Sequence, residues 1–132
     1  MAERISEAEL AVMEALWASP VPLTAQDVHD RIGDARDWSD RTVKTMLGRL
    51  LAKGVLAHEE DGRRYLYRPA VKRDAYVAGE SRRLVDRLFG GRAAPLVAHL
   101  AEGDGLTAQD IAELEALLKE LKIGRASCRE RV

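Results

Sequence analysis

The sequence predicts a mainly α-helical protein with one small β-hairpin. Three observations favour this fold class. Apolar residues recur at helical spacing along most of the chain, several segments begin with residues that cap helix starts, and Asp61-Gly62 separates two short runs of strand-forming residues. A chain of 132 residues can bury one modest core, and a second, smaller helical unit would need a partner to cover its apolar face.

The first helix is expected over residues 7–18. Ser6 and Glu9 have the spacing of a capping box, in which each side chain accepts a hydrogen bond from the other residue's backbone N–H. The larger apolar residues that follow fall on one face of this helix: Leu10, Met13, Leu16 and Trp17. Pro20 cannot donate to a helical hydrogen-bond ladder, so the helix is expected to end before it.

The second helix is expected to begin after Thr24, a residue type that caps helix starts, and to stop at Gly33. A third helix follows Ser39, which is another such cap. Its apolar residues share one stripe that would pack on the first two helices: Val43, Met46, Leu47 and Leu50. Lys53-Gly54 is expected to close this helix.

Two short strands are expected over residues 55–59 and 64–68, around a turn at residues 60–63. Asp-Gly is a strong hairpin signal because both central residues of such a turn take positive φ. Tyr65 and Tyr67 would share one face of the second strand, so one side of the hairpin packs inward while Arg63 and Arg64 lie at its tip.

Charge is distributed unevenly along the chain. Residues 1–37 contain three basic and eight acidic residues, whereas residues 38–73 contain nine basic and four acidic ones. Charged runs usually mark solvated helix faces, which is the plainer interpretation. The basic excess falls on the third helix and the hairpin, however, and this position favours contact with phosphates.

The exposed face of the third helix is expected to carry cations and hydroxyls, with no acid beyond the first turn. These candidate DNA-binding residues are Arg41, Thr42, Lys44, Thr45 and Arg49, together with Arg63 and Arg64 at the hairpin tip. Two helices, a basic helix and a hairpin form the serial order of a winged helix-turn-helix. The alternative is a winged helix that serves as a protein-protein interaction module, where the basic residues would be incidental.

Residues 1–72 are therefore predicted to form a winged helix, and residues 73–122 a three-helix dimerisation domain. About 50 residues in three helices are too few to enclose a core of useful size, whereas a second copy would cover their apolar faces. The candidate dimerisation residues are Tyr76, Leu84, Leu88, Ile111, Leu114, Leu118 and Leu121. The alternative is that these helices fold back onto the winged helix.

The last residues, 123–132, break the pattern of the preceding helix. Their sequence, IGRASCRERV, resembles the translation of a sequencing adapter, so we expect a non-native tail after Lys122. Excluding this tail removes Cys128, the only cysteine. No disulfide, thiolate metal site or cysteine nucleophile is then expected.

Enzymatic and membrane functions find little support in the sequence. His29, His58 and His99 fall in three separate elements, without paired histidines, a glycine-rich phosphate loop or a nucleophile motif, so no catalytic residue, cofactor or metal is expected. No stretch approaches the roughly 20 apolar residues that span a bilayer, and the first residues lack the apolar core of a signal peptide. We expect a cytoplasmic protein with no membrane insertion.

Five motifs along the chain form a recognisable set: Ile5-Ser6-Glu7-Ala8-Glu9, Trp38-Ser39, Thr42-Val43-Lys44-Thr45, Lys53-Gly54 and Gly62-Arg63-Arg64-Tyr65-Leu66-Tyr67. Together they resemble the motifs of the penicillinase repressor family, of the BlaI, MecI and CopY type. With weaker matches further on, the resemblance covers nearly all of residues 4–121. It implies a homodimeric transcriptional repressor, in which an N-terminal winged helix binds double-stranded operator DNA at an inverted repeat and a helical C-terminal domain dimerises.

Two departures from the family pattern bear on the inducing signal. Copper-responsive members carry clustered C-terminal cysteines, and this chain has none before Cys128, so copper sensing is not expected. In penicillin-responsive members an Asn-Phe bond is cut, and His99-Leu100 occupies the corresponding place here. The resemblance thus implies a candidate cleavage site at His99-Leu100 and a membrane-bound sensor protease as a candidate partner.

Overall fold

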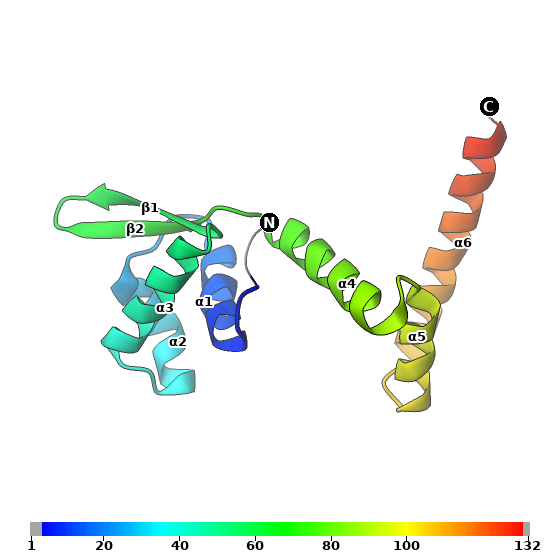
Figure 1. The fold of residues 1–132 in the computed structure, drawn as a ribbon, viewed down its shortest axis with the longest axis horizontal. Coiled ribbons are helices and arrows are strands. Elements are labelled where there is room, and N and C mark those ends of the chain that lie inside the picture. Colours follow the sequence, from blue (N-terminus) through cyan, green and yellow to red (C-terminus); the bar gives the residue numbers. More distant parts are fainter. Residues whose placement is uncertain (1–3, 131–132) are drawn as a thin grey trace. The chain divides into compact units, whose positions relative to one another are not determined.

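The computed structural model describes the backbone of residues 4–130 and the side chains of residues 4–32 and 36–124. Along these residues the order of elements is α1 (Glu7–Trp17), α2 (Ala25–Arg36), α3 (Asp40–Ala52), β1 (Leu56–Asp61), β2 (Arg64–Pro69), α4 (Arg73–Phe89), α5 (Ala93–Glu102) and α6 (Ala108–Glu130) (Figure 1). The predicted fold class, mainly helical with one hairpin, is confirmed. The chain divides into two compact units, residues 1–79 and 80–132.

The start of α1 is the predicted capping box. The Ser6 hydroxyl accepts from the Glu9 backbone N–H at 3.2 Å, and the Glu9 carboxylate accepts from the Ser6 backbone N–H at 3.3 Å. Thr24 and Asp27 make the same reciprocal pair at the start of α2, each at 3.1 Å. Both starts follow from residues three apart in sequence, which explains why the sequence alone predicts them.

The end of α2 was predicted wrongly. The helix continues through Gly33 to Arg36, and Asp37 then takes a left-handed conformation with φ 53°. Glycine in a helix interior costs only about 1 kcal/mol, so it weakens a helix without ending it. The left-handed residue that closes a helix is usually Gly, but Asp tolerates this conformation better than most residues do.

The core of the first unit lies between α1, α2 and α3, which are grouped beneath the hairpin in Figure 1. Its most deeply buried side chains are Val12, Met13, Leu16, Val28, Val43, Leu47, Leu50 and Val55. The predicted inward stripe of α3 is thus confirmed at Val43, Leu47 and Leu50, while Met46 is half-buried at its margin.

Backbone hydrogen bonds fasten the hairpin to the helices. Leu23, just before α2, donates to the Tyr67 carbonyl at 2.9 Å and accepts from the Tyr67 N–H at 2.7 Å. Strand β2 therefore pairs with β1 on one side and, through Tyr67, with Leu23 on the other. This bridge sets the position of the hairpin against α2 and α3.

The turn of the hairpin lies one residue later than predicted. Asp61 is the last residue of β1 and pairs with Arg64, the first residue of β2, so the turn residues are Gly62 and Arg63. Gly62 has φ 67°, whereas Arg63 does not take positive φ. A positive φ at the first turn residue alone is typical of a type II′ turn, for which Gly in that position is preferred.

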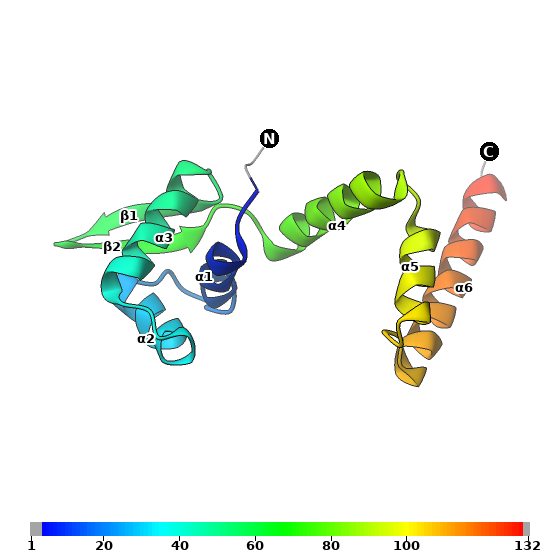
Figure 2. The ribbon, with the colours of Figure 1, turned by 60° about the horizontal axis from the view of Figure 1, so that its bottom comes forward.

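The second unit has few buried side chains. Val85 of α4 is buried there, and the ring of Phe89 lies 5.6 Å from that of His99. A loop reverses the chain between α5 and α6 (Figure 2). The expected tail begins after Lys122, and the backbone of α6 stays helical through its residues 123–130. The last two residues of that tail, 131–132, lie outside the described part of the chain. No helix in the described residues is both long enough and apolar enough to cross a membrane.

Candidate nucleic-acid interface

The candidate interface is built on α3. Ser39 caps this helix by accepting from the Thr42 backbone N–H at 3.2 Å. Because Val43, Leu47 and Leu50 are buried in the core, the opposite face of α3 is directed to solvent. Arg41, Lys44, Thr45 and Arg49 are exposed on the helix, and Thr42 is half-buried.

The two threonines of α3 already make local hydrogen bonds. The Thr45 hydroxyl donates to the Arg41 carbonyl at 2.9 Å, and the Thr42 hydroxyl lies 3.1 Å from that of Ser39. Such bonds leave the oxygen lone pairs and the methyl groups available to a groove. Either threonine could therefore accept from a base or contact a thymine methyl without giving up its local bond.

A cleft of about 580 Å³ lies between the start of α2, the face of α3 and the hairpin. It is lined by Thr24, Ala25, Gln26, Asp40, Lys44, Arg63, Arg64, Tyr65 and Tyr67. The cleft brings Lys44 of the third helix together with Arg63 and Arg64 of the turn. Of the residues predicted to bind DNA, these three share the cleft, whereas Arg41, Thr42, Thr45 and Arg49 do not line it.

Six of the nine residues that line the cleft were not among the predicted binding candidates, and three of the six carry side chains suited to polar or stacking contacts. Gln26 lies at the start of α2, and Tyr65 and Tyr67 lie on one face of β2. The alternation of the tyrosines predicts their common face, but only the Leu23 bridge brings α2 beside them. On the same hairpin, the His58 ring lies 4.7 Å from that of Tyr65 and 5.8 Å from that of Tyr67.

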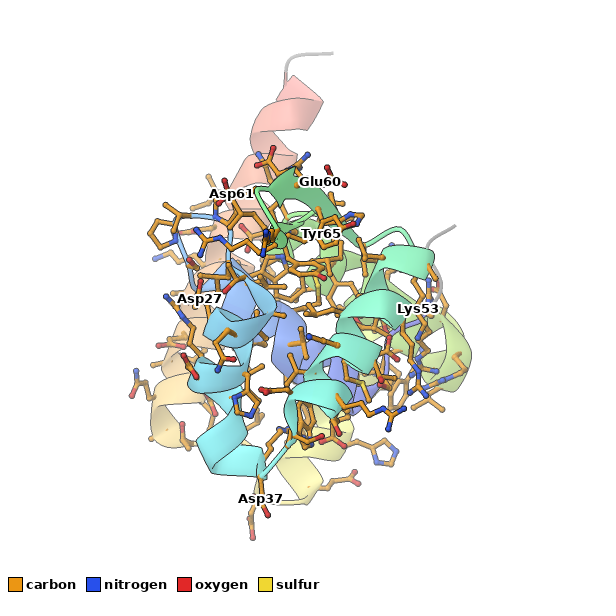
Figure 3. The ribbon with its side chains drawn as sticks, turned by 90° about the vertical axis from the view of Figure 1, so that its left-hand side faces the viewer. Asp27, Asp37, Lys53, Glu60, Asp61 and Tyr65 are labelled. Carbon is orange, nitrogen blue, oxygen red and sulfur yellow. The ribbon has the colours of Figure 1, made fainter. Side chains whose placement is uncertain are left out.

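The cleft cations differ in their acidic partners. Arg64 contacts the Asp61 carboxylate through Nη2 at 3.0 Å and Nε at 3.1 Å. Neither Lys44 nor Arg63 has an acidic partner within ion-pair distance in the part of the chain that the structure describes. Hydrogen bonds from Thr24 hold the pKa of Asp27 below its usual value, and the charge of Arg64 lowers that pKa further. Figure 3 shows Asp61 and Tyr65 on the hairpin above Asp27.

Two cations of the basic segment serve the fold instead of the cleft. Lys53 contacts the Glu9 carboxylate at 2.8 Å and donates to the Arg4 carbonyl at 3.0 Å. Arg73 contacts Glu14 at 3.0 Å. Lys53 lies away from the cleft at the end of α3 (Figure 3). The net positive charge counted from the sequence therefore overstates the charge that the cleft presents.

Glu9 is 3% exposed, which makes its pair with Lys53 the most buried ion pair among the described residues. Burial alone raises the pKa of Glu9, but hydrogen bonds from Lys53 and Ser6 and the Lys53 charge together outweigh it. The pKa of Glu9 consequently lies below its ordinary value of 4.5. The carboxylate stays ionised in the folded protein.

The predicted dimerisation residues are placed differently from one another. Tyr76 is half-buried against Trp17, with ring centroids 5.6 Å apart, so its ring is used inside the first unit. Leu84 and Leu114 are half-buried. The remaining predicted residues, Leu88, Ile111, Leu118 and Leu121, are between 47% and 59% exposed.

The candidate cleavage bond lies inside α5. The carbonyl of His99 accepts from Gly103 at 3.2 Å, and that of Leu100 accepts from Gly105 at 2.8 Å. A peptide bond held in a helix is a poor protease substrate until the helix opens locally. Within the described residues, no cluster of His, Cys, Asp and Glu could hold a metal ion.

Comparison with known proteins identifies the relatives of this chain. A family model described as Penicillinase repressor matches residues 5–120. The chain is 33% identical over 119 residues to the penicillinase repressor of Bacillus licheniformis, covering 90% of this chain and 92% of that protein. It is 37% identical over 123 residues to the transcriptional regulator BlaI of Mycobacterium tuberculosis, covering 86% of each.

A solved structure resembles the first part of the chain. It is the monomeric form of Bacillus licheniformis BlaI in complex with the blaP half-operator, with a TM-score of 0.50 and 34% identity. The match covers 58% of this chain and 92% of that one. This likeness extends the comparison from sequence to the fold of the helices and hairpin.

Proposed function

This chain belongs to the penicillinase repressor family, and we propose that it is a DNA-binding transcriptional repressor acting in the cytoplasm. In this proposal α3 lies in the major groove of an operator, while the hairpin acts as a wing on the adjacent sugar-phosphate backbone. The half-operator complex of the related BlaI supports the assignment of double-stranded DNA as the partner.

The cleft is the observation that carries this proposal. Lys44, Arg63 and Arg64 come from two elements and converge on one concave surface beside the exposed face of α3. A DNA backbone carries closely spaced phosphates, and such a cluster of cations suits one strand that passes between helix and wing. Arg41, Thr45 and Arg49 then stand along the exposed face of α3, where base edges or further phosphates would lie.

Salt dependence separates this function from a protein-protein interaction module. Each neutralised phosphate contributes about −0.9 to the slope of log affinity against log salt, so Arg63 and Arg64 predict a slope of about −2 for each copy of the chain that is bound. Fluorescence anisotropy with a duplex from the DNA upstream of the gene, at several salt concentrations, measures it. Affinity that does not change with salt would support the interaction module instead.

The roles of individual cations can be tested on the same duplex and on a random one. Lys44→Ala should weaken binding to the operator more than to random DNA, by about 1–3 kcal/mol, if Lys44 reaches base edges. Arg63→Ala should weaken both to the same extent and flatten the salt slope by about one unit. Equal losses on both duplexes for Lys44→Ala would make Lys44 a phosphate contact.

We also propose that the second unit forms a homodimer. Among the described residues, its exposed large apolar side chains are Leu88, Val97, Leu100, Ile111, Leu117, Leu118, Leu121 and Ile123. Ile111, Leu118 and Leu121 share one face of α6 by their spacing, and contiguous exposed apolar surface usually marks an interface. A two-fold dimer would present two copies of α3 to an inverted repeat, with half-site centres about one helical turn apart or a small multiple of it.

The route of induction is a further proposal that rests on family membership. Cleavage between His99 and Leu100 by a membrane-bound sensor protease would cut α5 and separate α6 from the rest of the unit. A specific protease site introduced at residues 98–101 tests this route. Cleavage should lower operator affinity by roughly 10²- to 10⁴-fold, the advantage of a tethered second module. Unchanged affinity after complete cleavage would exclude proteolytic relief.

A further inference from the structure

The hairpin register places an acid directly opposite one of the cleft cations. Asp61 ends β1 and pairs with Arg64, which begins β2. Both Nε and Nη2 of Arg64 reach the same carboxylate oxygen, Oδ2, at 3.1 and 3.0 Å. The contact follows from the turn lying at Gly62-Arg63, since a turn centred on Asp61-Gly62 would have removed Asp61 from the ladder.

This pairing distinguishes Arg64 from its neighbours in the cleft. Lys44 and Arg63 have no acidic partner among the described residues, whereas Arg64 is paired with Asp61 and also acts on Asp27. The side chains of Arg64 and Asp61 are 65% and 49% exposed. An ion pair this exposed is weak, so a stronger anion can displace the carboxylate.

We propose that Asp61 is a built-in competitor of the DNA phosphate, which holds Arg64 in the free protein and lowers affinity for DNA. This inference rests on the proposed function. When DNA binds, a phosphate oxygen takes the place of the Asp61 carboxylate on the guanidinium, and the carboxylate returns to water. Asp61 opposes binding because its contact with Arg64 must break before a phosphate can take its place.

Asp61 also acts on binding in a way that does not depend on DNA sequence. The contact that it opposes is to the backbone, so operator and random DNA should be affected to the same extent. The basic cleft would otherwise hold the protein on any duplex. Asp61 thus limits non-specific binding without taking part in base recognition.

The variant Asp61→Asn removes the charge and keeps the shape of the side chain. The turn itself depends on Gly62, so the hairpin should persist. Glu59→Gln is the matched control, because Glu59 lies two residues earlier on the same face of β1, is exposed, and pairs across the ladder with Leu66 instead of a cation. Both variants change the net charge equally.

The experiment measures the affinity of the full chain for a mixed-sequence duplex of about 30 base pairs, long enough for two half-sites, at low salt. Asp61→Asn should bind about two- to five-fold more tightly than Glu59→Gln, which corresponds to the upper part of the usual range for an exposed ion pair. In an Arg64→Ala background this difference should disappear. Thermal melting of each variant confirms that the fold is retained.

The possible failures are distinguishable. Wild-type protein that shows no salt-dependent binding to duplex DNA would overturn the proposed function and this inference with it. If the wild type binds and Arg64→Ala weakens binding, but Asp61→Asn matches Glu59→Gln, the proposed function stands and the competitor role is refuted. If Asp61→Asn still binds more tightly than Glu59→Gln in the Arg64→Ala background, Asp61 acts on DNA by charge repulsion alone. That result would also refute the competitor role.

Discussion

The two units of this chain differ in how far they bury their apolar side chains. The first unit buries its large aliphatic residues between three helices and a hairpin, and side chains such as Val12 and Leu47 have no exposed surface. In the second, Val85 is buried, while Leu118 and Leu121 are more than half exposed. Apolar burial is the main favourable term in folding, so the first unit should be stable alone and the second should depend on a partner.

The largest expected effect breaks the second unit and leaves the first intact. Leu118→Lys removes a buried leucine from both copies of the proposed dimer, about 1.5–3 kcal/mol each, and should raise the dimer dissociation constant at least about a hundred-fold. Sedimentation velocity measures this shift. Ala116→Lys places the same charge on the opposite face of α6 and should leave the dimer unchanged. If the Leu118→Lys protein remains dimeric, the dimer interface does not include this face of α6.

The next prediction breaks the first unit from inside. Lys53→Ala leaves the buried Glu9 carboxylate without its cation. Removing one member of such a pair should lower the free energy of unfolding by about 3 kcal/mol, the low end of the usual range because Lys53 is partly exposed. Urea denaturation measures the loss. As a control, Lys72→Ala changes an exposed lysine and should alter stability by less than about 0.5 kcal/mol.

A smaller effect locates the boundary between the two units. Trp17 donates to the Val71 carbonyl at 2.9 Å and packs on Tyr76, and Glu14 pairs with Arg73. The first turns of α4 therefore support α1, and a fragment of residues 1–79 should be more stable than residues 1–72 by about 1–2 kcal/mol. In the longer fragment Tyr76→Ala should reproduce most of the loss. Equal stability of both fragments would support a boundary at residue 72.

The smallest effect is a pH dependence within the first unit. The pKa of Glu9 in the folded protein lies below its ordinary value of 4.5, so its pair stabilises the fold above that value. This contribution is lost as the pH falls through the lowered pKa, because the unfolded chain binds the proton more readily. Glu9→Gln should be less stable near neutral pH but lose less stability on acidification. Parallel stability curves for the two proteins would contradict this role.

Local sequence signals predicted much of the fold. The caps at Ser6, Thr24 and Ser39 depend on residues three positions away, so their sequence pattern is enough to identify them. The end of α2 and the position of the hairpin turn were predicted wrongly from Gly33 and Asp61-Gly62, because a glycine is compatible with several backbone structures. It can lie inside a helix, end one, or take either central position of a turn, and the surrounding structure decides which.

The sequence predicted the candidate binding residues of each element separately, but not how the elements come together in one cleft. The amphipathic pattern of α3 identifies its exposed cations, and the hairpin signal identifies Arg63 and Arg64. That Lys44 meets them in one cleft with Gln26 depends on the Leu23 bridge, which joins residues distant in sequence. The pairing of Lys53 with Glu9 and of Arg73 with Glu14 is of the same kind. Contacts of this range leave no periodic trace in the sequence.

The bridge between Leu23 and Tyr67 also has an evolutionary consequence. It consists of two main-chain hydrogen bonds, which any residue except proline can make at these positions. The position of the wing is therefore specified without reference to the identity of the side chains that we propose to contact DNA. Residues such as Lys44, Thr45 and Arg63 are free to change under selection while the frame that holds them stays the same, so related repressors can acquire new operators by surface substitution alone.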